Sequence, residues 1–179
     1  MVDPVTSRRW LYRALFVALG VLGIYVNLLP IDPAPGGLPG PDLPVLLAYA
    51  WVLRRPDYVP VLLVAAVLLA TDILFLRPIG LWSALALIGL EILRAREPIS
   101  RDLPLLLEWA MVGVVLALVT AAHWLLLSLF MVDHPGFGLL ALQFLVTLAC
   151  YPLVVAFTRW GLRLRRSSPG EVDALGHRL

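Results

Sequence analysis

The chain has 179 residues, of which 61% are hydrophobic and only 15% are charged, and its mean hydropathy is +0.91. Soluble domains carry closer to a quarter of charged residues, so this composition excludes a soluble globular protein and a soluble catalytic domain. All 14 basic residues are arginines at the ends of hydrophobic runs, where they orient membrane helices; the net charge of +2 therefore does not indicate nucleic acid. The sequence predicts an all-α integral membrane protein with a single polytopic domain, residues 1–179.

Six hydrophobic runs separated by polar turns predict six transmembrane helices, of which the second and fourth are short: 11–29, 42–53, 59–76, 79–93, 105–130 and 139–157. Twelve residues of helix, as in the second run, rise only about 18 Å against a bilayer core of about 30 Å. Arginine positions nevertheless favour a crossing there, because six spans leave 13 of the 14 arginines on one side and only Arg77 on the other. Both termini are then cytoplasmic, and residues 159–179 are expected to form a flexible cytoplasmic tail.

The third run is the most distinctive stretch, because its eighteen residues include a single charged side chain, Asp72. An intramembrane carboxylate is costly and usually functional, so we expect Asp72 to face protein or water. Two roles remain open. Asp72 is either a functional group that binds a cation, relays a proton or anchors a partner helix, or a structural acceptor of hydrogen bonds from a neighbouring helix or the following turn. Pro78 moves Arg77 off helical geometry, which lets Arg77 curl back towards Asp72.

The fifth run carries small residues at every fourth position, Gly113, Ala117 and Ala121, a spacing that allows the close approach of another helix. Its polar residues, Glu108 and His123, are turned away from this small-residue seam.

The remaining polar groups of the runs are interpreted as structural. Glu91 and Glu108 stand near arginines at the inner ends of their runs, which predicts surface ion pairs, including one between Glu91 and Arg94 three residues on. A single histidine on an apolar helix, such as His123, is typical of a packed ring with one hydrogen bond. In the sixth run, Pro152 predicts a kink.

No catalytic, cofactor-binding or metal-binding motif stands out in the sequence. Phosphate-binding loops, nucleophile elbows, HExxH and CxxC patterns are all absent. A catalytic set assembled from His123, Asp72 and Ser128 has no support from its spacing, and a triad is recognised by geometry. We therefore expect no enzyme activity, no cofactor and no metal.

Three short motifs and the overall pattern of spans point to one family. The motifs are Gly40-Pro41-Asp42-Leu43 before Leu46-Leu47, the turn Arg54-Arg55-Pro56, and Asp72 near the outer end of the third run with Gly80-Leu81 opening the fourth. Together with a Pro-rich first outer loop and a basic tail, they resemble the rod shape-determining protein MreD family. Leu68 departs from a glycine that is common one turn before the Asp, and Phe75-Leu76-Arg77-Pro78 replaces the usual small, polar turn.

The resemblance implies a non-enzymatic scaffold subunit of the bacterial cell-elongation machinery for peptidoglycan synthesis, a multi-pass protein of the inner membrane. Its implied partners are the bitopic protein MreC, the RodA glycosyltransferase with its penicillin-binding transpeptidase and, indirectly, the MreB filament. Such a subunit acts by helix–helix recognition. The contact surfaces expected here are the small-residue seam and a corner of the chain made of Asp42, Asp72, Arg77, Gly80 and Leu81.

A second class of function remains open, the substrate-binding subunit of a small-molecule transporter of the vitamin type. Small six-span proteins with Pro-interrupted segments include such subunits. Asp72, Glu108 and His123 are the candidates to line a polar pocket for that role.

Overall fold

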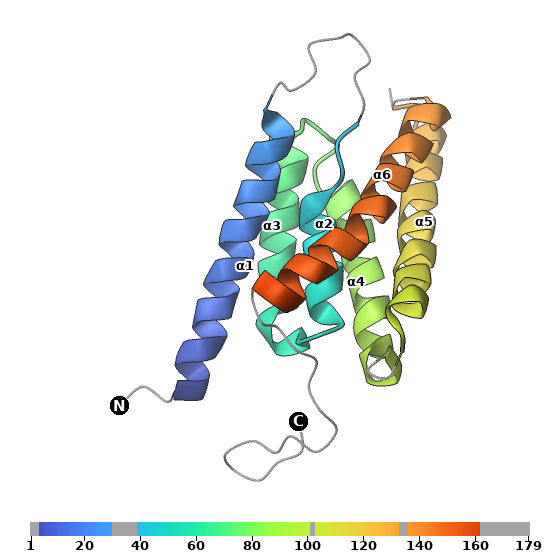
Figure 1. The fold of residues 1–179 in the computed structure, drawn as a ribbon. Coiled ribbons are helices and arrows are strands. Elements are labelled where there is room, and N and C mark those ends of the chain that lie inside the picture. Colours follow the sequence, from blue (N-terminus) through green and yellow to red (C-terminus); the bar gives the residue numbers. More distant parts are fainter. Residues whose placement is uncertain (1–3, 30–38, 101–102, 133–135, 162–179) are drawn as a thin grey trace.

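The computed structural model describes residues 4–29, 39–100, 103–132 and 136–161, and these residues form a bundle of six α-helices. The helices are α1 (Pro4–Leu28), α2 (Leu43–Val52), α3 (Val61–Leu74), α4 (Leu81–Ser100), α5 (Leu105–Leu129) and α6 (Phe137–Ala156). A 3-10 turn (Pro56–Tyr58) follows α2, and a π-helical turn (Phe157–Gly161) follows α6. Consecutive helices run in opposite directions along the bundle (Figure 1).

Three segments are long and apolar enough to cross a membrane: Ser7–Leu28 in α1, Leu105–Leu129 in α5 and Phe137–Trp160, which covers α6 and the turn after it. α2 and α3 are also apolar but hold only 10 and 14 residues. Large apolar side chains cover the outside of the bundle, as Leu118 and Leu125 do on α5, where they are 63% and 60% exposed. An apolar outer surface of this extent suggests a membrane protein.

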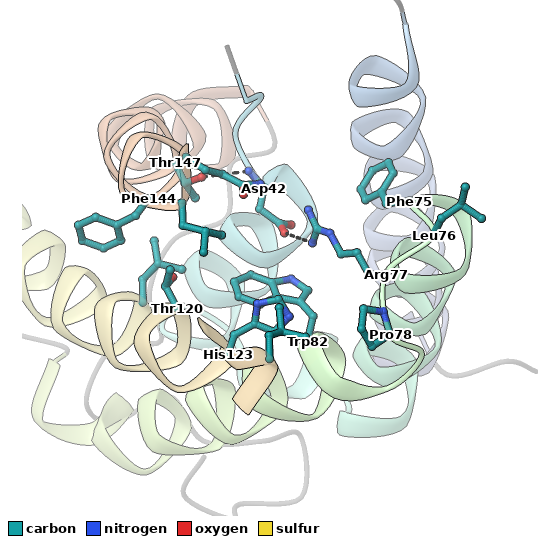
Figure 2. A pocket seen from close by; sticks show the side chains of 14 residues that line it. Asp42, Phe75, Leu76, Arg77, Pro78, Trp82, Thr120, His123, Phe144 and Thr147 are labelled. Carbon is teal, nitrogen blue, oxygen red and sulfur yellow. Dashed lines mark hydrogen bonds and ion pairs between the residues drawn. The ribbon is translucent and has the colours of Figure 1, made fainter. Parts of the chain in front are cut away.

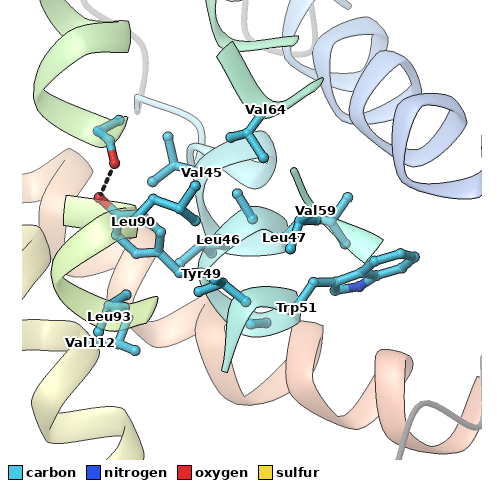
Figure 3. Packing of buried hydrophobic residues seen from close by; sticks show 14 of the residues in the cluster. Val45, Leu46, Leu47, Tyr49, Trp51, Val59, Val64, Leu90, Leu93 and Val112 are labelled. Carbon is cyan, nitrogen blue, oxygen red and sulfur yellow. Dashed lines mark hydrogen bonds between the residues drawn. The ribbon is translucent and has the colours of Figure 1, made fainter. Parts of the chain in front are cut away.

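The shortest helix, α2, lies at the centre of the bundle. Every residue from Pro44 to Val52 is buried, and α2 packs against α1, α3, α4 and α6. Figure 3 shows Val45, Leu46 and Tyr49 of α2 among side chains from the surrounding helices. A helix that is hydrophobic all round is suited to such a position, because no face has to meet water. The sequence made the third run the most distinctive stretch, whereas the structure makes the second run the core.

One glycine allows α2 and α4 to approach closely. The Tyr49 hydroxyl donates a hydrogen bond to the Ala86 carbonyl, at 3.1 Å (Figure 3). A Cβ atom at Gly89 would collide with that hydroxyl oxygen. The buried tyrosine therefore satisfies its polar end only because residue 89 has no side chain.

The helix bounds differ from the predicted spans at three places. α1 begins at Pro4 instead of residue 11. α4 continues to Ser100, seven residues beyond the predicted end of the fourth span, so residues 94–100 are helical; that the part of α4 that crosses the membrane is short stays a prediction. Residues 94–97 have high helix propensity and extend the helix beyond its hydrophobic part, and Pro98 lies inside its last turn. Described residues 159–161 lie in the π-helical turn, so the tail predicted from 159 can begin only after them.

The other bounds agree with the sequence to within two residues. The predicted runs 42–53, 59–76, 105–130 and 139–157 correspond to α2, α3, α5 and α6. Pro152 lies inside α6, and the predicted kink stays a prediction. The rest of the predicted tail, residues 162–179, and most of the Pro-rich loop, residues 30–38, lie outside the described residues. The number of crossings and the side on which the termini lie also stay predictions.

Candidate functional site

Buried polar groups gather at both ends of α2, and Asp42 begins the first cluster. Asp42 is the N-cap of α2, and its Oδ1 accepts a hydrogen bond from the Val45 N–H at 3.4 Å. Its backbone N–H donates to the Thr147 hydroxyl in α6 at 3.2 Å. Its Oδ2 forms an ion pair with Arg77 Nη1 at 3.3 Å (Figure 2). One aspartate thus connects the start of α2 to α6 and to the turn between α3 and α4.

Arg77 takes a different partner from the one expected. Its backbone N–H donates to the Asp72 carbonyl at 3.0 Å, while its guanidinium pairs with Asp42 instead of curling back to the Asp72 carboxylate. The guanidinium carbon also lies 5.2 Å from the ring centre of Phe75 and 5.6 Å from that of Trp82. These cation–π contacts and the ion pair fix the orientation of a partly exposed arginine.

Asp72 caps the N-terminus of α4 from the neighbouring helix α3. Its Oδ2 accepts hydrogen bonds from the Gly80 N–H at 2.9 Å, the Ser83 N–H at 3.2 Å and the Ser83 hydroxyl at 2.6 Å. Since α4 begins at Leu81, the Ser83 N–H belongs to its first turn and the Gly80 N–H to the residue just before it, and N–H groups at these positions have no acceptor within the helix. The negative charge is also favourable at a helix N-terminus. These hydrogen bonds are the ones expected for the structural role, whereas Oδ1 of the same fully buried carboxylate has no hydrogen-bond partner among the described residues.

The backbone of the α3–α4 corner depends on Gly80. Its φ of +86° lies in the left-handed region that side chains disfavour. This conformation turns the Gly80 N–H towards Asp72. Leu81, the next residue, is half-buried at the first position of α4. The predicted corner of Asp42, Asp72, Arg77, Gly80 and Leu81 is thus one continuous region, although the two aspartates bind different partners.

The second cluster lies at the other end of α2 and joins three helices. Arg54 follows α2 and pairs with Glu108 of α5, with 3.0 Å between Nη1 and Oε1. Glu108 also accepts a hydrogen bond from the Tyr151 hydroxyl in α6, and Arg54 donates to the Ala50 carbonyl at 2.8 Å. Arg54 is 4% exposed and Glu108 is fully buried. The prediction that Glu108 forms a surface pair is therefore wrong, because the pair with Arg54 is buried inside the bundle, where Tyr151 of α6 also contacts Glu108.

Sequence reasoning assigned no site role to Arg54 or Tyr151. Arg54 stands beside Arg55 among the arginines that indicate topology, and adjacent arginines give no signal that one of them turns inward. The surface pair predicted between Glu91 and Arg94 is confirmed, at 2.9 Å. Both residues lie in α4, and Arg94 also donates a hydrogen bond to the Val59 carbonyl at 2.7 Å.

The predicted polar pocket of Asp72, Glu108 and His123 is not formed. Fifteen residues of α5 separate Glu108 from His123, a rise of about 22 Å along the helix, so the two side chains belong to opposite ends of the bundle. His123 is buried and lies edge-on to Trp82, with 5.1 Å between ring centres. Helical periodicity indicates which side of α5 a residue lies on, and it does not bring together two side chains that are far apart along the helix axis.

The small-residue seam of α5 divides into a buried and an exposed part. Gly113 is buried against α6, and a Cβ atom added there would lie 3.2 Å from Leu148 Cδ1. Ala117 and Ala121 are exposed. Within the seam, the expected close approach to another helix of the chain is therefore present only at Gly113, which packs against α6. The two alanines lie on the outer surface of the bundle.

A cavity of about 310 Å³ lies beside the Asp42–Arg77 pair, between α5, α6 and the α3–α4 corner (Figure 2). Its walls combine polar and apolar side chains: Asp42, Phe75, Leu76, Arg77, Pro78, Trp82, Leu116, Thr120, His123, Leu127, Leu140, Gln143, Phe144 and Thr147. A smaller hollow of about 180 Å³ shares four of these residues and adds Asn27 and residues 39–41. Of the predicted site residues, Asp42, Arg77 and His123 line the larger cavity.

No family model, curated protein or solved structure matches this chain. Within the described residues, no group of three or more His, Cys, Asp or Glu side chains is placed to hold a metal ion.

Proposed function

We propose that this chain is a non-enzymatic, multi-pass scaffold subunit of the bacterial inner membrane, which acts by helix–helix recognition. The resemblance to the MreD family suggests the cell-elongation machinery as its setting, with MreC as the direct partner and RodA, its transpeptidase and MreB further along the assembly.

The observation that supports this proposal is that the buried charged side chains bind neighbouring helices of the same chain. Asp72 caps α4, and Glu108 and Arg54 bind α5 to the end of α2. Intramembrane charges are costly and most often mark ion or substrate pathways. Here they are separated along the bundle, and each one binds a neighbouring helix. Such an arrangement restricts the movement of the helices relative to one another, and a subunit that docks to other proteins requires a rigid surface.

The exposed part of α5 offers a surface for a partner helix. Ala117 and Ala121 lie between large exposed side chains, Val114, Leu118 and Leu125. Small residues flanked by large ones allow a second backbone to approach within the membrane, where packing replaces the hydrophobic effect as the driving force. The transmembrane helix of a bitopic protein has the geometry to lie in this position.

The test is recovery of a partner from the native membrane. The tagged chain, solubilised in mild detergent, is expected to retain MreC. Replacing both Ala117 and Ala121 by leucine should lower that recovery by about tenfold, the equivalent of roughly 1.4 kcal/mol of association free energy. The control is Ala18→Leu, the same enlargement on the exposed surface of α1. Undiminished recovery by the α5 variant, or a preparation without any bitopic partner, would count against the proposal.

The cavity favours a second candidate function, the substrate-binding subunit of a small-molecule transporter. Its volume of about 310 Å³ is at the lower end of the range of roughly 300–1,000 Å³ that is typical of ligand pockets. A transporter subunit should retain a small molecule through purification, whereas a scaffold should retain a protein.

A further inference from the structure

Trp82, one of the residues that line the larger cavity, has a hydrogen-bond donor without a partner in the described part of the chain. Trp82 lines the cavity and is 7% exposed. Its Nε1 is buried and has no hydrogen-bond partner among the described residues. Buried donors are almost always paired. An unpaired one on a cavity wall therefore points to an acceptor that enters the cavity.

The Trp82 ring is held in place by its neighbours. The Arg77 guanidinium lies over the ring at 5.6 Å, and the His123 ring meets it edge-on at 5.1 Å. Figure 2 shows Trp82 next to His123 and facing the Asp42–Arg77 pair. Because these contacts restrict rotation of the indole, the N–H is presented in a fixed direction, as a binding site requires.

The remaining walls define the chemistry of an occupant. Asp42 and Arg77 neutralise each other at 3.3 Å, so neither of them is free to act as the counter-ion of a charged occupant, which would have to give up its hydration on entering. Thr120 and Gln143 add polar groups, and Leu116 and Phe144 add apolar area. A single water molecule would fill only a small part of this volume, since its share of liquid volume is about 30 Å³.

We propose that this cavity binds a compact, net-neutral amphipathic molecule. Its acceptor atom takes the hydrogen bond from Trp82 Nε1–H, and its apolar part packs against the aromatic and aliphatic walls. A volume of about 310 Å³ suits a molecule of one or two rings. This site is independent of the scaffold function, because a docking subunit and a transporter subunit can each hold such a ligand.

The test uses 4-(trifluoromethyl)benzamide as the probe, because it joins a ring to a carbonyl acceptor and its fluorine is visible by NMR. Binding to the full chain in lipid nanodiscs is measured against empty nanodiscs. We expect saturable binding that Trp82→Phe weakens about tenfold, as the loss of one hydrogen bond would. Thr120→Phe, which fills the cavity, should abolish it.

The matched control is Trp51→Phe. The Nε1 of Trp51 is likewise buried without a partner among the described residues, but its ring packs against Phe16 and Tyr12, away from the cavity. Trp51→Phe should leave the affinity unchanged. An analogue without an acceptor, 1-ethyl-4-(trifluoromethyl)benzene, should show no difference between the native chain and Trp82→Phe.

Either of two results would overturn the proposal: no saturable binding beyond that of empty nanodiscs, or equal effects of the Trp82 and Trp51 variants. Should Thr120→Phe fail to fold, Gln143→Leu replaces it and should weaken binding by removing another polar wall group. Partner recovery from the membrane is measured separately, so failure here is distinguishable from failure of the scaffold proposal.

Discussion

Replacing Glu108 by glutamine should destabilise the bundle far more than an ordinary loss of an ion pair. Glutamine keeps the size of the side chain and an acceptor for the Tyr151 hydroxyl, but it removes the charge opposite Arg54. The Arg54 side chain is 5% exposed, so among the described residues its cation would remain buried with the neutral Ala50 carbonyl and the new amide as its acceptors.

The magnitude follows from the burial of both partners. Removing one member of a buried pair costs about 3–5 kcal/mol, because the other charge is left uncompensated, whereas replacing both members by apolar residues is often neutral or stabilising. Glu108→Gln should therefore lower the free energy of unfolding by about 3–5 kcal/mol. The double variant Arg54→Met, Glu108→Leu should recover most of that loss.

The assay is equilibrium unfolding in mixed micelles, followed by tryptophan fluorescence. The control is Glu91→Gln, which removes an equivalent pair with Arg94 in which the glutamate side chain is 48% exposed, and it should change stability by no more than about 1 kcal/mol. If Glu108→Gln lowers the free energy of unfolding no more than Glu91→Gln does, or if the double variant is less stable than Glu108→Gln, the buried pair does not hold the helices together.

Three further substitutions test other contacts. Asp72→Ala should lower the free energy of unfolding by about 1–3 kcal/mol, because it leaves three donors at the start of α4 unsatisfied. The measurement is a thermal scan in detergent. If Asp72→Asn and Asp72→Ala both unfold at the same temperature as the native chain, Asp72 does not stabilise α4 as a cap. Gly89→Ala should lower the midpoint temperature of unfolding, because the new methyl group would displace the Tyr49 hydroxyl. Gly138→Ala is the control and should be tolerated, since the space around Gly138 is open. Equal midpoints for the two variants would refute the close approach of α2 and α4. Gly113→Leu should reduce the yield of monodisperse protein and Ala117→Leu should not, since of these two residues only Gly113 is packed within the chain. A larger loss for Ala117→Leu than for Gly113→Leu would mean that α5 presents a different face to α6.

Much of the helical framework follows from the sequence, because hydrophobic runs and turn residues act locally. The run 105–130 and the helix Leu105–Leu129 nearly coincide. The end of α4 could not be read in the same way, since hydropathy reports where a helix can meet lipid and not where its hydrogen bonds stop. Arginine counting also could not show that Arg54 points into the bundle.

The site was predictable in its residue types and not in its pairings. Asp72 stood out because a lone carboxylate in an apolar run needs partners, and the structure supplies them from α4. The partners themselves depend on how helices far apart in the sequence pack: Asp42 meets Arg77 across 35 positions, and Arg54 meets Glu108 across 54. Periodicity along one helix contains no information about such contacts.

We expect α2, although only ten residues long, to cross the membrane inside a shell of other helices. Single cysteines at Arg55, Arg77 and Arg96, in a chain with Cys150 replaced by serine, test it by labelling with a membrane-impermeant maleimide. Positions 55 and 96 should react only from the cytoplasmic side, and position 77 only from the outside. Labelling of position 55 from the outside would show that α2 does not cross, and the six-span arrangement would be wrong.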